Sequence, residues 1–501
     1  MGHPRVLMLT NVEFGESNVF LATARALLQQ NPSVELHIAS FCSLESSVHS
    51  LRENLQNSMP EVVPIRFHRI AGLNMTEALQ QHFINRGTAL TGGYLPKSFS
   101  SHLNFSGTLR AIRDAIPILI PYSGPELEKV VTSIVAIIGE VEADQVVVDS
   151  LMTPALTACY HLDIKFICLS PNSIKEFAAS SQPWGAVFWR YPAVFSSFSY
   201  PVPWYRIPQN ILYLLYAGYY FRTDNHRIEV EFHLAQTARM KLRTPIDLLR
   251  PPSDLKILVS TWPELDFPAM KLPSHLYPCG PIVQESEPIS KTNPDLDEWL
   301  SKHKTIYINL GSICRLDEDQ STEIALGLRN IYNSVSQDHG PGLQILWKLK
   351  RYGNFETGTG SKIHDVLGQE IDNDLVRIVD WLQEQPSAIL QSGHIACSIH
   401  HGGANSYNEA ASAGIPQVIL PQWTDCYDYG QRVEILGIGK LGNSPATARF
   451  TAKSISEAVR QVLFSEAAKT IEQRAMDLAD IVRSRGAGAD NTAQVLLQNC
   501  K

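Results

Sequence analysis

The sequence predicts two α/β domains in tandem, each built on a doubly wound parallel sheet, with a cleft between them. Short apolar runs alternate with loop and helix signals along both halves of the chain, which is the pattern of a parallel sheet. The length of 501 residues also exceeds the roughly 250–300 residues at which single cores stop growing. Because open sheets of this kind bind ligands at the carboxyl ends of their strands, the cleft is the expected site.

The first half opens with a strand, a loop, a helix and a second strand. We expect the strand over Arg5 to Thr10, the loop over Asn11 to Gly15, the helix over Ser17 to Gln30 and the second strand over Val34 to Phe41. Such a unit is the building block of a parallel sheet. A further strand, helix and strand are predicted over residues 145–149, 153–161 and 165–169.

A second series begins at Lys304, after a Pro- and Gly-bearing stretch that reads as a linker. Its predicted strands cover 305–310, 343–349, 376–379, 394–399 and 417–420, with a helix over 318–332. The predicted organisation is a first domain over 1–277, a linker over 278–303, a second domain over 304–469, and closing helices over 470–501 that return to the first domain.

Composition favours a small ligand. The formal net charge of −8 and the lack of a Lys/Arg-rich run argue against nucleic acid or an anionic membrane surface as the main partner. The apolar stretch Asn210 to Phe221 is too short for a transmembrane segment, which needs about 20 residues. The N-terminus lacks the apolar region of a signal peptide. We therefore expect a cytoplasmic protein without a transmembrane segment.

Neither a disulfide framework nor a metal site is expected. The eight cysteines are scattered without a C-x-x-C pair, as in a reduced cytosolic protein. His400 and His401 are adjacent, so they point to opposite sides of a strand, and no third ligand is evident. The aromatic stretch from Phe177 to Arg222 leaves two interpretations open: an apolar ligand pocket, or core and domain-interface packing.

The segment HHGGANSYNE, from His400 to Glu409, predicts an anion site. An apolar strand precedes it, Gly402-Gly403 turn the chain, and Asn405 or Ser406 is expected to cap a helix that runs to Ala413. Free amides at a helix start suit a diphosphate, and glycines let the backbone approach it closely. His401 and Ser406 can add hydrogen bonds.

Glu409 has two interpretations. Three residues after Ser406, it fits a capping box in which its carboxylate returns to the helix start. A carboxylate one turn into such a helix also offers two acceptor oxygens to the vicinal hydroxyls of a ribose.

The run WLQEQPSAILQSGHIACSIHHGGANSYNEAASAGIPQVILPQWTDCYDYGQ, from Trp381 to Gln431, resembles the donor-binding signature of the UDP-dependent glycosyltransferases of family 1. LVSTWPELDFP at Leu258, YPCGPIV at Tyr277 and IYINLGS ending in Ser312 extend the likeness over most of the chain. The resemblance is to the fungal branch that acts on small molecules. It implies the GT-B fold of two Rossmann-like domains, the first binding the acceptor and the second the UDP-sugar.

The resemblance implies a role for each matching residue. Trp381 would stack on the uracil, although a Trp that closes the core is the alternative. Asn405 would hold the loop and the phosphates, Glu409 would bind the ribose, and Asp425 the sugar hydroxyls. The diphosphate would meet the loop of Gly311 and Ser312, the glycine turn at Gly403, and His401 and Ser406.

Three departures from the family pattern leave assignments open. The spacing from Trp381 to His401 is two residues longer than in plant members, so either Gln385 or Glu384 is the nucleotide-contacting residue. Ala404 stands where plant members carry Trp. Cys426 replaces the Gln or His that follows the sugar-binding acid, so we expect Cys426 to contact the sugar in its place. UDP-glucose is therefore only the default donor, with no cofactor beyond this co-substrate.

The largest departure concerns the general base. The family has a His after the Gly of the first strand–helix loop, whereas this chain reads Gly15-Glu16-Ser17-Asn18. We expect Glu16 to be the catalytic base and Asp149 to tune its pKa or to bind the acceptor hydroxyl. The alternatives are a helix-start carboxylate that serves the dipole for Glu16 and a strand-end residue held by loop amides for Asp149.

The implied reaction is inverting transfer of glucose from UDP-glucose to a hydroxyl of a small apolar molecule, giving a β-O-glycoside. A phenol, with a pKa of about 10, needs less help from a weak carboxylate base than an alcohol does. The competing hypotheses are a non-catalytic relative that binds the nucleotide-sugar, a nucleotide-sugar epimerase, and a sterol or lipid glycosyltransferase.

Overall fold

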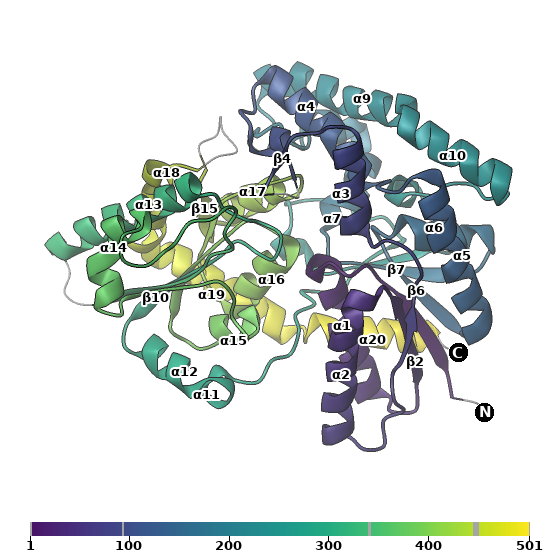
Figure 1. Cartoon of the computed structure of the whole chain (residues 1–501), viewed down its shortest axis with the longest axis horizontal. Coiled ribbons are helices and arrows are strands. Elements are labelled where there is room, and N and C mark those ends of the chain that lie inside the picture. Colours follow the sequence, from purple (N-terminus) through teal and green to yellow (C-terminus); the bar gives the residue numbers. More distant parts are fainter. Residues whose placement is uncertain (1–2, 93–94, 339–341, 444–449, 500–501) are drawn as a thin grey trace.

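Two parallel β-sheets, one in each half of the chain, form the centre of the computed structural model (Figure 1). The structure describes residues 3–92, 95–338, 342–443 and 450–499. The first sheet has 7 strands in the order β3-β2-β1-β6-β7-β8-β9, and the second has 6 in the order β12-β11-β10-β13-β14-β15. The predicted fold class, two doubly wound parallel-sheet domains, is confirmed.

The central strands are buried on both faces and accordingly read as continuous apolar runs. All residues of β6 and β7 are buried. The strands of the first sheet are β1 (Arg5–Leu9), β2 (Glu35–Ser40), β3 (Arg66–Arg69), β6 (Gln145–Asp149), β7 (Phe166–Ser170), β8 (Lys256–Val259) and β9 (Leu276–Pro278). Those of the second are β10 (Lys304–Asn309), β11 (Leu343–Lys348), β12 (Val376–Val379), β13 (Ile395–His400), β14 (Gln417–Ile419) and β15 (Gly439–Leu441). A small antiparallel pair joins β4 (Leu90–Thr91) to β5 (Leu95–Pro96).

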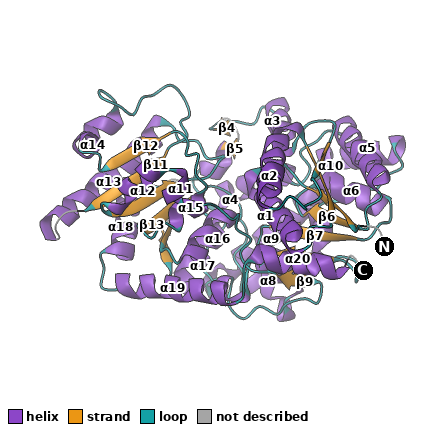
Figure 2. Ribbon diagram, turned by 90° about the horizontal axis from the view of Figure 1, so that it is seen from below, coloured by secondary structure: helices purple, strands orange, loops and turns teal. Residues whose placement is uncertain are grey.

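Helices cover both faces of each sheet (Figure 2). In the first domain they are α1 (Phe14–Gln30), α2 (Glu45–Ser58), α3 (Met75–Asn85), α4 (Phe105–Ala115), α5 (Gly124–Val141), α6 (Thr153–His161), α7 (Ile174–Ala178), α8 (Ala186–Trp189), α9 (Ile207–Thr223) and α10 (Asn225–Thr237). The later ones are α11 (Ile289–Thr292), α12 (Pro294–Ser301), α13 (Glu318–Asp338), α14 (Lys362–Asp372), α15 (Pro386–Leu390), α16 (Ala404–Ala413), α17 (Cys426–Leu436), α18 (Ala452–Leu463), α19 (Ala468–Ser484) and α20 (Gly488–Asn499).

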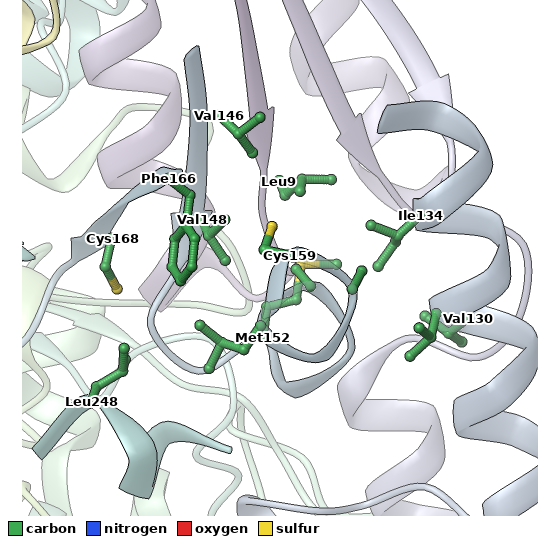
Figure 3. Packing of buried hydrophobic residues seen from close by; sticks show 14 of the residues in the cluster. Leu9, Val130, Ile134, Val146, Val148, Met152, Cys159, Phe166, Cys168 and Leu248 are labelled. Atoms are coloured by element: carbon green, nitrogen blue, oxygen red, sulfur yellow. The ribbon is translucent and has the colours of Figure 1, made fainter. Parts of the chain in front are cut away.

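The core on one face of the first sheet is made by strand residues that meet α5 and α6. Figure 3 shows Leu9 and Val148 from the strands near Ile134 of α5, with Met152 and Cys159 beside them. Each is buried, so this layer fixes where β1 and β6 end. Those two ends matter because the strand order reverses between β1 and β6, and ligands bind at such a switch point.

The closing helical stretch is split. α19 packs on the second domain, where Ala475 and Val482 share a core cluster with Tyr407 of α16. A break at Gly486, whose φ is 81°, then turns the chain, and α20 packs on the first domain. Its residues Ala489, Ala493 and Leu496 lie in one cluster with apolar residues of α1 and α2. Of the closing helices predicted over residues 470–501, α19 thus packs on the second domain and α20 on the first.

Two helices of the second domain, α16 and α17, contact the first domain directly. On α16, the Tyr407 hydroxyl donates to Leu265 O at 2.8 Å and Asn408 Nδ2 donates to Ser260 O at 2.8 Å. Because these donors are buried, leaving either unpaired is costly. The interface therefore fixes the register of α16 against the first domain.

On α17, two buried cation–carboxylate pairs cross the interface. Lys175 Nζ pairs with Asp428, and Arg432 Nε lies 3.8 Å from Asp266 Oδ1, with both of these side chains almost completely buried. The Arg432 guanidinium also lies 3.9 Å from the ring centroid of Tyr429. A buried charge is tolerated only with such compensation.

No helix in the described part of the chain is both long enough and apolar enough to cross a membrane.

Removing the Asp266 carboxylate would leave the buried Arg432 charge without this anion. We expect Asp266→Ala to lower the free energy of unfolding by about 3–5 kcal/mol in urea denaturation. The control is Glu264→Ala, which removes a pair with Arg485 at 2.8 Å on the surface, where such pairs contribute about 0–1 kcal/mol. Equal losses from the two substitutions would contradict the role of the buried pair.

Candidate active site

The candidate site lies where the carboxyl ends of the central strands of the two sheets face each other. From the first sheet, β1 leads to the start of α1 and β6 ends at Asp149. From the second, β10 leads to Gly311 and Ser312, and β13 leads to His401. Asn405 Nδ2 joins the halves by donating to Phe14 O at 3.0 Å.

Glu16 lies in the first turn of α1. The structure corrects the prediction of a loop up to Gly15, because the helix already begins at Phe14. Glu16 is 6 % exposed and Asp149 is fully buried. A hydrogen bond joins the two side chains, so one of the two carboxyl groups must carry a proton.

Asp149 is the better stabilised anion of this pair. Its Oδ2 accepts from the Asn11 backbone N–H at 3.0 Å and from Asn11 Nδ2 at 2.9 Å, and its Oδ1 accepts from the Leu151 N–H at 2.8 Å. Burial raises the pKa of Asp149, but these donors oppose the rise. The interpretation of Asp149 as a strand-end residue held by loop amides is thus realised, and it is compatible with contact to Glu16.

The pKa of Glu16 is raised well above its ordinary value. Burial is the largest cause, the negative charge of Asp149 is the second, and the charges of Glu13 and Asp425 act in the same direction. Its Oε2 atom is buried without a hydrogen-bond partner among the described residues. We therefore assign the shared proton to Glu16 and the negative charge to Asp149.

In the second domain, His400 is structural and His401 faces the site. His400 Nδ1 accepts from the Gly402 N–H at 3.1 Å, which leaves Nε2–H to donate to Gln417 Oε1 at 2.9 Å. Burial lowers the pKa of His401 to about 3, so this imidazole is neutral at physiological pH. Its Nδ1 is buried and has no partner in the described structure.

The glycines around His401 are required by space. A Cβ at Gly311 would lie 2.7 Å from His401 Cε1, and one at Gly403 would lie 2.4 Å from its Nε2. Gly311 also has a φ of 84°, which side chains other than glycine rarely adopt. The ring thus lies directly between the two predicted backbone turns.

The start of α16 differs from the prediction. Gly403 is the N-cap residue and no side chain caps the helix. Asn405 and Ser406 lie within the first turn, so neither caps it, and Glu409 cannot complete a capping box from Ser406. The first backbone N–H groups of α16 lack intrahelical acceptors, as at any helix start, and they follow directly on His401.

Trp381 is 45 % exposed, which excludes the alternative that it closes the core. Lys348 Nζ lies 4.0 Å from its ring centroid, and Lys350 Nζ lies 5.2 Å from it. Lys350 also donates to Ser312 O at 2.6 Å. Neither lysine was predicted from the sequence; the signal available was their position at the carboxyl end of β11, which pairs with β10.

Glu409 is a partly buried carboxyl group whose ionised form is disfavoured. Burial raises its pKa to about 8, and the charge of Lys348 opposes this rise only in part. Of the two candidates for nucleotide contact, Glu384 accepts from Asn293 Nδ2 at 2.7 Å, whereas Gln385 is exposed. The structure therefore favours Gln385 as the residue free to meet a ligand.

Asp425 is the N-cap residue of α17 and accepts from Thr424 Oγ1 at 2.9 Å. Burial raises its pKa. The next residue, Cys426, is fully buried, so the expectation that it contacts the sugar is corrected: its thiol faces the protein interior. Within the described residues, no group of three or more His, Cys, Asp or Glu side chains is arranged to hold a metal ion.

Comparison with known proteins identifies the family. Glycosyltransferase sdnJ of Sordaria araneosa is 32% identical over 449 residues, which cover 88% of this chain and 84% of that protein. The chain belongs to the UDP-glycosyltransferases of glycosyltransferase family 1. Residues 365–487 match the model of the Erythromycin biosynthesis protein CIII-like C-terminal domain. UDP-glycosyltransferase 84A2 of Arabidopsis thaliana is 25% identical over 248 residues, 46% of each chain.

Solved UDP-glycosyltransferases share the GT-B fold along the whole chain. A UDP-glucosyltransferase from Polygonum tinctorium superposes with a TM-score of 0.62 at 15% identity, covering 100% of this chain and 99% of that one. A transferase from Siraitia grosvenorii, solved in complex with UDP, gives 0.56 at 14% identity, covering 99% of each chain. The fold implied by the sequence resemblance is confirmed.

The raised pKa of Glu409 predicts a stability effect. The stability that Glu409 contributes is full below its unfolded value near 4.5 and is lost as the pH rises through about 8. The free energy of unfolding of Glu409→Gln is compared with that of the wild type by urea denaturation at each pH. We expect this difference to be more favourable to the variant at about pH 8 than at about pH 5, by about 1 kcal/mol or more. Glu457→Gln, on the exposed face of α18, is the control, and a pH-independent difference for Glu409→Gln would contradict the assignment.

Proposed function

We propose that this UDP-glycosyltransferase transfers a hexose, with UDP-glucose as the default donor, to a hydroxyl of a small apolar molecule. Transfer proceeds with inversion and yields a β-O-glycoside. Glu16 acts as the catalytic base and Asp149 positions it. The observation that carries the proposal is the buried Glu16 carboxyl group, hydrogen-bonded to Asp149 and two residues from the Phe14 carbonyl that Asn405 contacts.

The donor half of the proposal rests on the residues around α16. Its free N–H groups and the neutral His401 are donors without charge, suited to oxygens of a diphosphate. Ser312 and Ser406 add hydroxyl donors, and Lys350 adds a cation beside Ser312. These groups would stabilise the negative charge that grows on UDP as it leaves.

The nucleoside and the sugar would lie on either side of this diphosphate. The exposed Trp381 is available to stack on the uracil, Gln385 to contact the nucleotide, and Glu409 to accept hydrogen bonds from the ribose. Asp425 would bind sugar hydroxyls. Because relatives include an erythritol-mannosyl-transferase of Mycosarcoma maydis, the sugar is the least constrained part of the proposal.

The acceptor half rests on an apolar cluster that spans both domains. Phe195 and Tyr213, from the aromatic stretch of the first domain, share it with the partly buried Trp423 and Tyr427, which flank Asp425. The ring of Trp423 lies 4.9 Å from that of His401. An apolar acceptor that contacts Trp423 would lie next to His401 of the donor site.

Catalysis would then need one proton transfer. The reactive form is the one in which Glu16 has lost the proton that it shares with Asp149, a form that gains population as the pH rises. In that form the acceptor oxygen attacks the anomeric carbon, the bond from that carbon to UDP breaks, and the Glu16 carboxylate takes the hydroxyl proton. A carboxylate with an ordinary pKa is a weak base, whereas burial and Asp149 make Glu16 a stronger one. A phenol remains the favoured acceptor because it gives up its proton more readily than an alcohol.

Glu16→Gln is expected to lower kcat by about a hundredfold to ten-thousandfold. It should leave UDP affinity within about twofold, since Glu16 is not among the residues proposed to hold UDP. Turnover is followed as UDP release from UDP-glucose with and without a panel of phenols and alcohols. Glu13→Gln is the matched control. That neighbouring carboxylate accepts from the Thr76 N–H at 2.9 Å and acts on Glu16 through its charge, so the substitution should shift the pH profile without abolishing turnover.

The pH profile separates catalysis from folding effects. In the wild type, kcat should rise with pH through the raised pKa of Glu16, and Asp149→Asn should shift this limb to lower pH because it removes a neighbouring negative charge. Near-normal turnover of Glu16→Gln would exclude Glu16 as the catalytic base. UDP binding without turnover in the wild type would favour a non-catalytic relative, and donor consumption without acceptor would favour an epimerase.

Trp381→Ala is expected to weaken UDP binding by about tenfold to a hundredfold, the effect of losing one base–aromatic stack, whereas Trp381→Phe should stay within a few-fold. Isothermal titration with UDP measures both. The control is Trp184→Ala, which removes an indole that is exposed in the first domain. Unchanged affinity of Trp381→Ala would exclude uracil stacking.

A further inference from the structure

A row of large apolar side chains lies on the outer face of α9 and the turn before it. Trp204 is 82 % exposed, Leu215 59 % and Tyr219 66 %, and Tyr205 and Leu212 are exposed beside them. Leu212, Leu215 and Tyr219 are three and four residues apart, so they share one face of the helix. We call these five residues the outer stripe. In Figure 1, α9 runs along the edge of the first domain, away from the second sheet.

The outer stripe is not needed for the core. The opposite face of α9 carries the buried Tyr213, with Leu214, Tyr216 and Ala217 against the apolar cluster that also contains Trp423. A surface helix that packs by one face ordinarily presents polar side chains on the other. Here the solvent side is apolar from Trp204 to Tyr219, a length of about 20 Å at 1.5 Å per residue. Contiguous exposed apolar patches of this kind mark interaction sites.

The chain segment that carries the stripe has charges of one sign. Between residues 177 and 223 the sequence has three arginines and no Asp, Glu or Lys, although the whole chain carries a net charge of −8. Arg206 and Arg222 are exposed at the two ends of α9, about 24 Å apart along its axis. Two acids beside α9, Asp114 and Asp224, are paired with Arg113 and Arg86. The charges of Arg206 and Arg222 therefore remain available to an approaching surface.

We propose that the outer stripe docks this enzyme on an anionic lipid surface. Trp and Tyr side chains favour the membrane–water interface because each joins an apolar ring to a polar group. Exposed arginines at both ends would meet lipid phosphates while the leucines enter the acyl boundary. Acidic side chains return on α10 with Glu229 and Glu231, which marks the edge of the surface.

The position of the outer stripe indicates how docking would serve the enzyme; this inference rests on the proposed function. α9 lies between the outer stripe and the apolar cluster proposed to receive the acceptor. Docking would bring that cluster close to the lipid in which an apolar acceptor concentrates. The lipid contact itself requires neither donor nor acceptor.

Co-sedimentation tests the contact. The full chain is spun with vesicles of phosphatidylcholine containing about one-third phosphatidylserine, and with phosphatidylcholine alone. We expect binding to the anionic vesicles that weakens as salt is raised. The double substitution Leu215→Glu and Tyr219→Glu should reduce binding at least about tenfold, and Arg206→Gln with Arg222→Gln about fivefold per arginine.

The control is Phe464→Glu, which adds one glutamate at an exposed apolar residue of the second domain and should leave vesicle binding unchanged. UDP affinity, measured in every variant, verifies folding, and turnover of a water-soluble acceptor is measured separately, so failure of docking and failure of transfer are distinguishable. Absence of vesicle binding, or equal loss in Phe464→Glu, would overturn the proposal. So would a dimer in sedimentation equilibrium that the stripe substitutions abolish without affecting vesicle binding.

Discussion

The desolvated contact between α17 and the first domain is the constraint on which the site depends. Asp428 and Arg432 each place a charge where water is excluded, and each faces an oppositely charged residue of the other domain, Lys175 or Asp266. Separating the domains by a small distance would leave these charges without both partner and solvent. Asp425, at the start of the same helix, and Glu16, on the opposite side, are therefore held in a fixed relation.

The sheets were predictable because buried parallel strands read directly as apolar runs. The predicted helix over Thr153–His161 matches α6, whose start carries Pro154 in the first turn. The starts of α1 and α16 were missed for a physical reason: Glu13 and Gly403 precede these helices without any side-chain cap. Where a helix begins without a capping side chain, capping rules place its first residue too late in the sequence.

The site was predictable where strand ends deliver side chains, as at Asp149 and His401, and less so where tertiary contacts decide. Lys348 is brought to Trp381 by strand pairing that no local pattern encodes. Cys426 was predicted to contact the sugar because it follows Asp425 in the sequence. Adjacent residues at a helix start point in different directions, and Cys426 is buried. The sequence could not distinguish Glu384 from Gln385 as the nucleotide contact, because the hydrogen bond from Asn293 to Glu384 is a tertiary contact.

Because the chain returns through α20, two separate chain segments connect the two domains. The polypeptide passes from the first domain to the second through the linker that starts after β9, and passes back through the short break at Gly486. A body held at two separate points can swing about the line that joins them but resists twisting out of plane. Since α20 lies against α1, the helix that carries Glu16, its anchor belongs to the same rigid block as the proposed base, and any opening of the cleft would tilt the donor domain past a stationary carboxyl group.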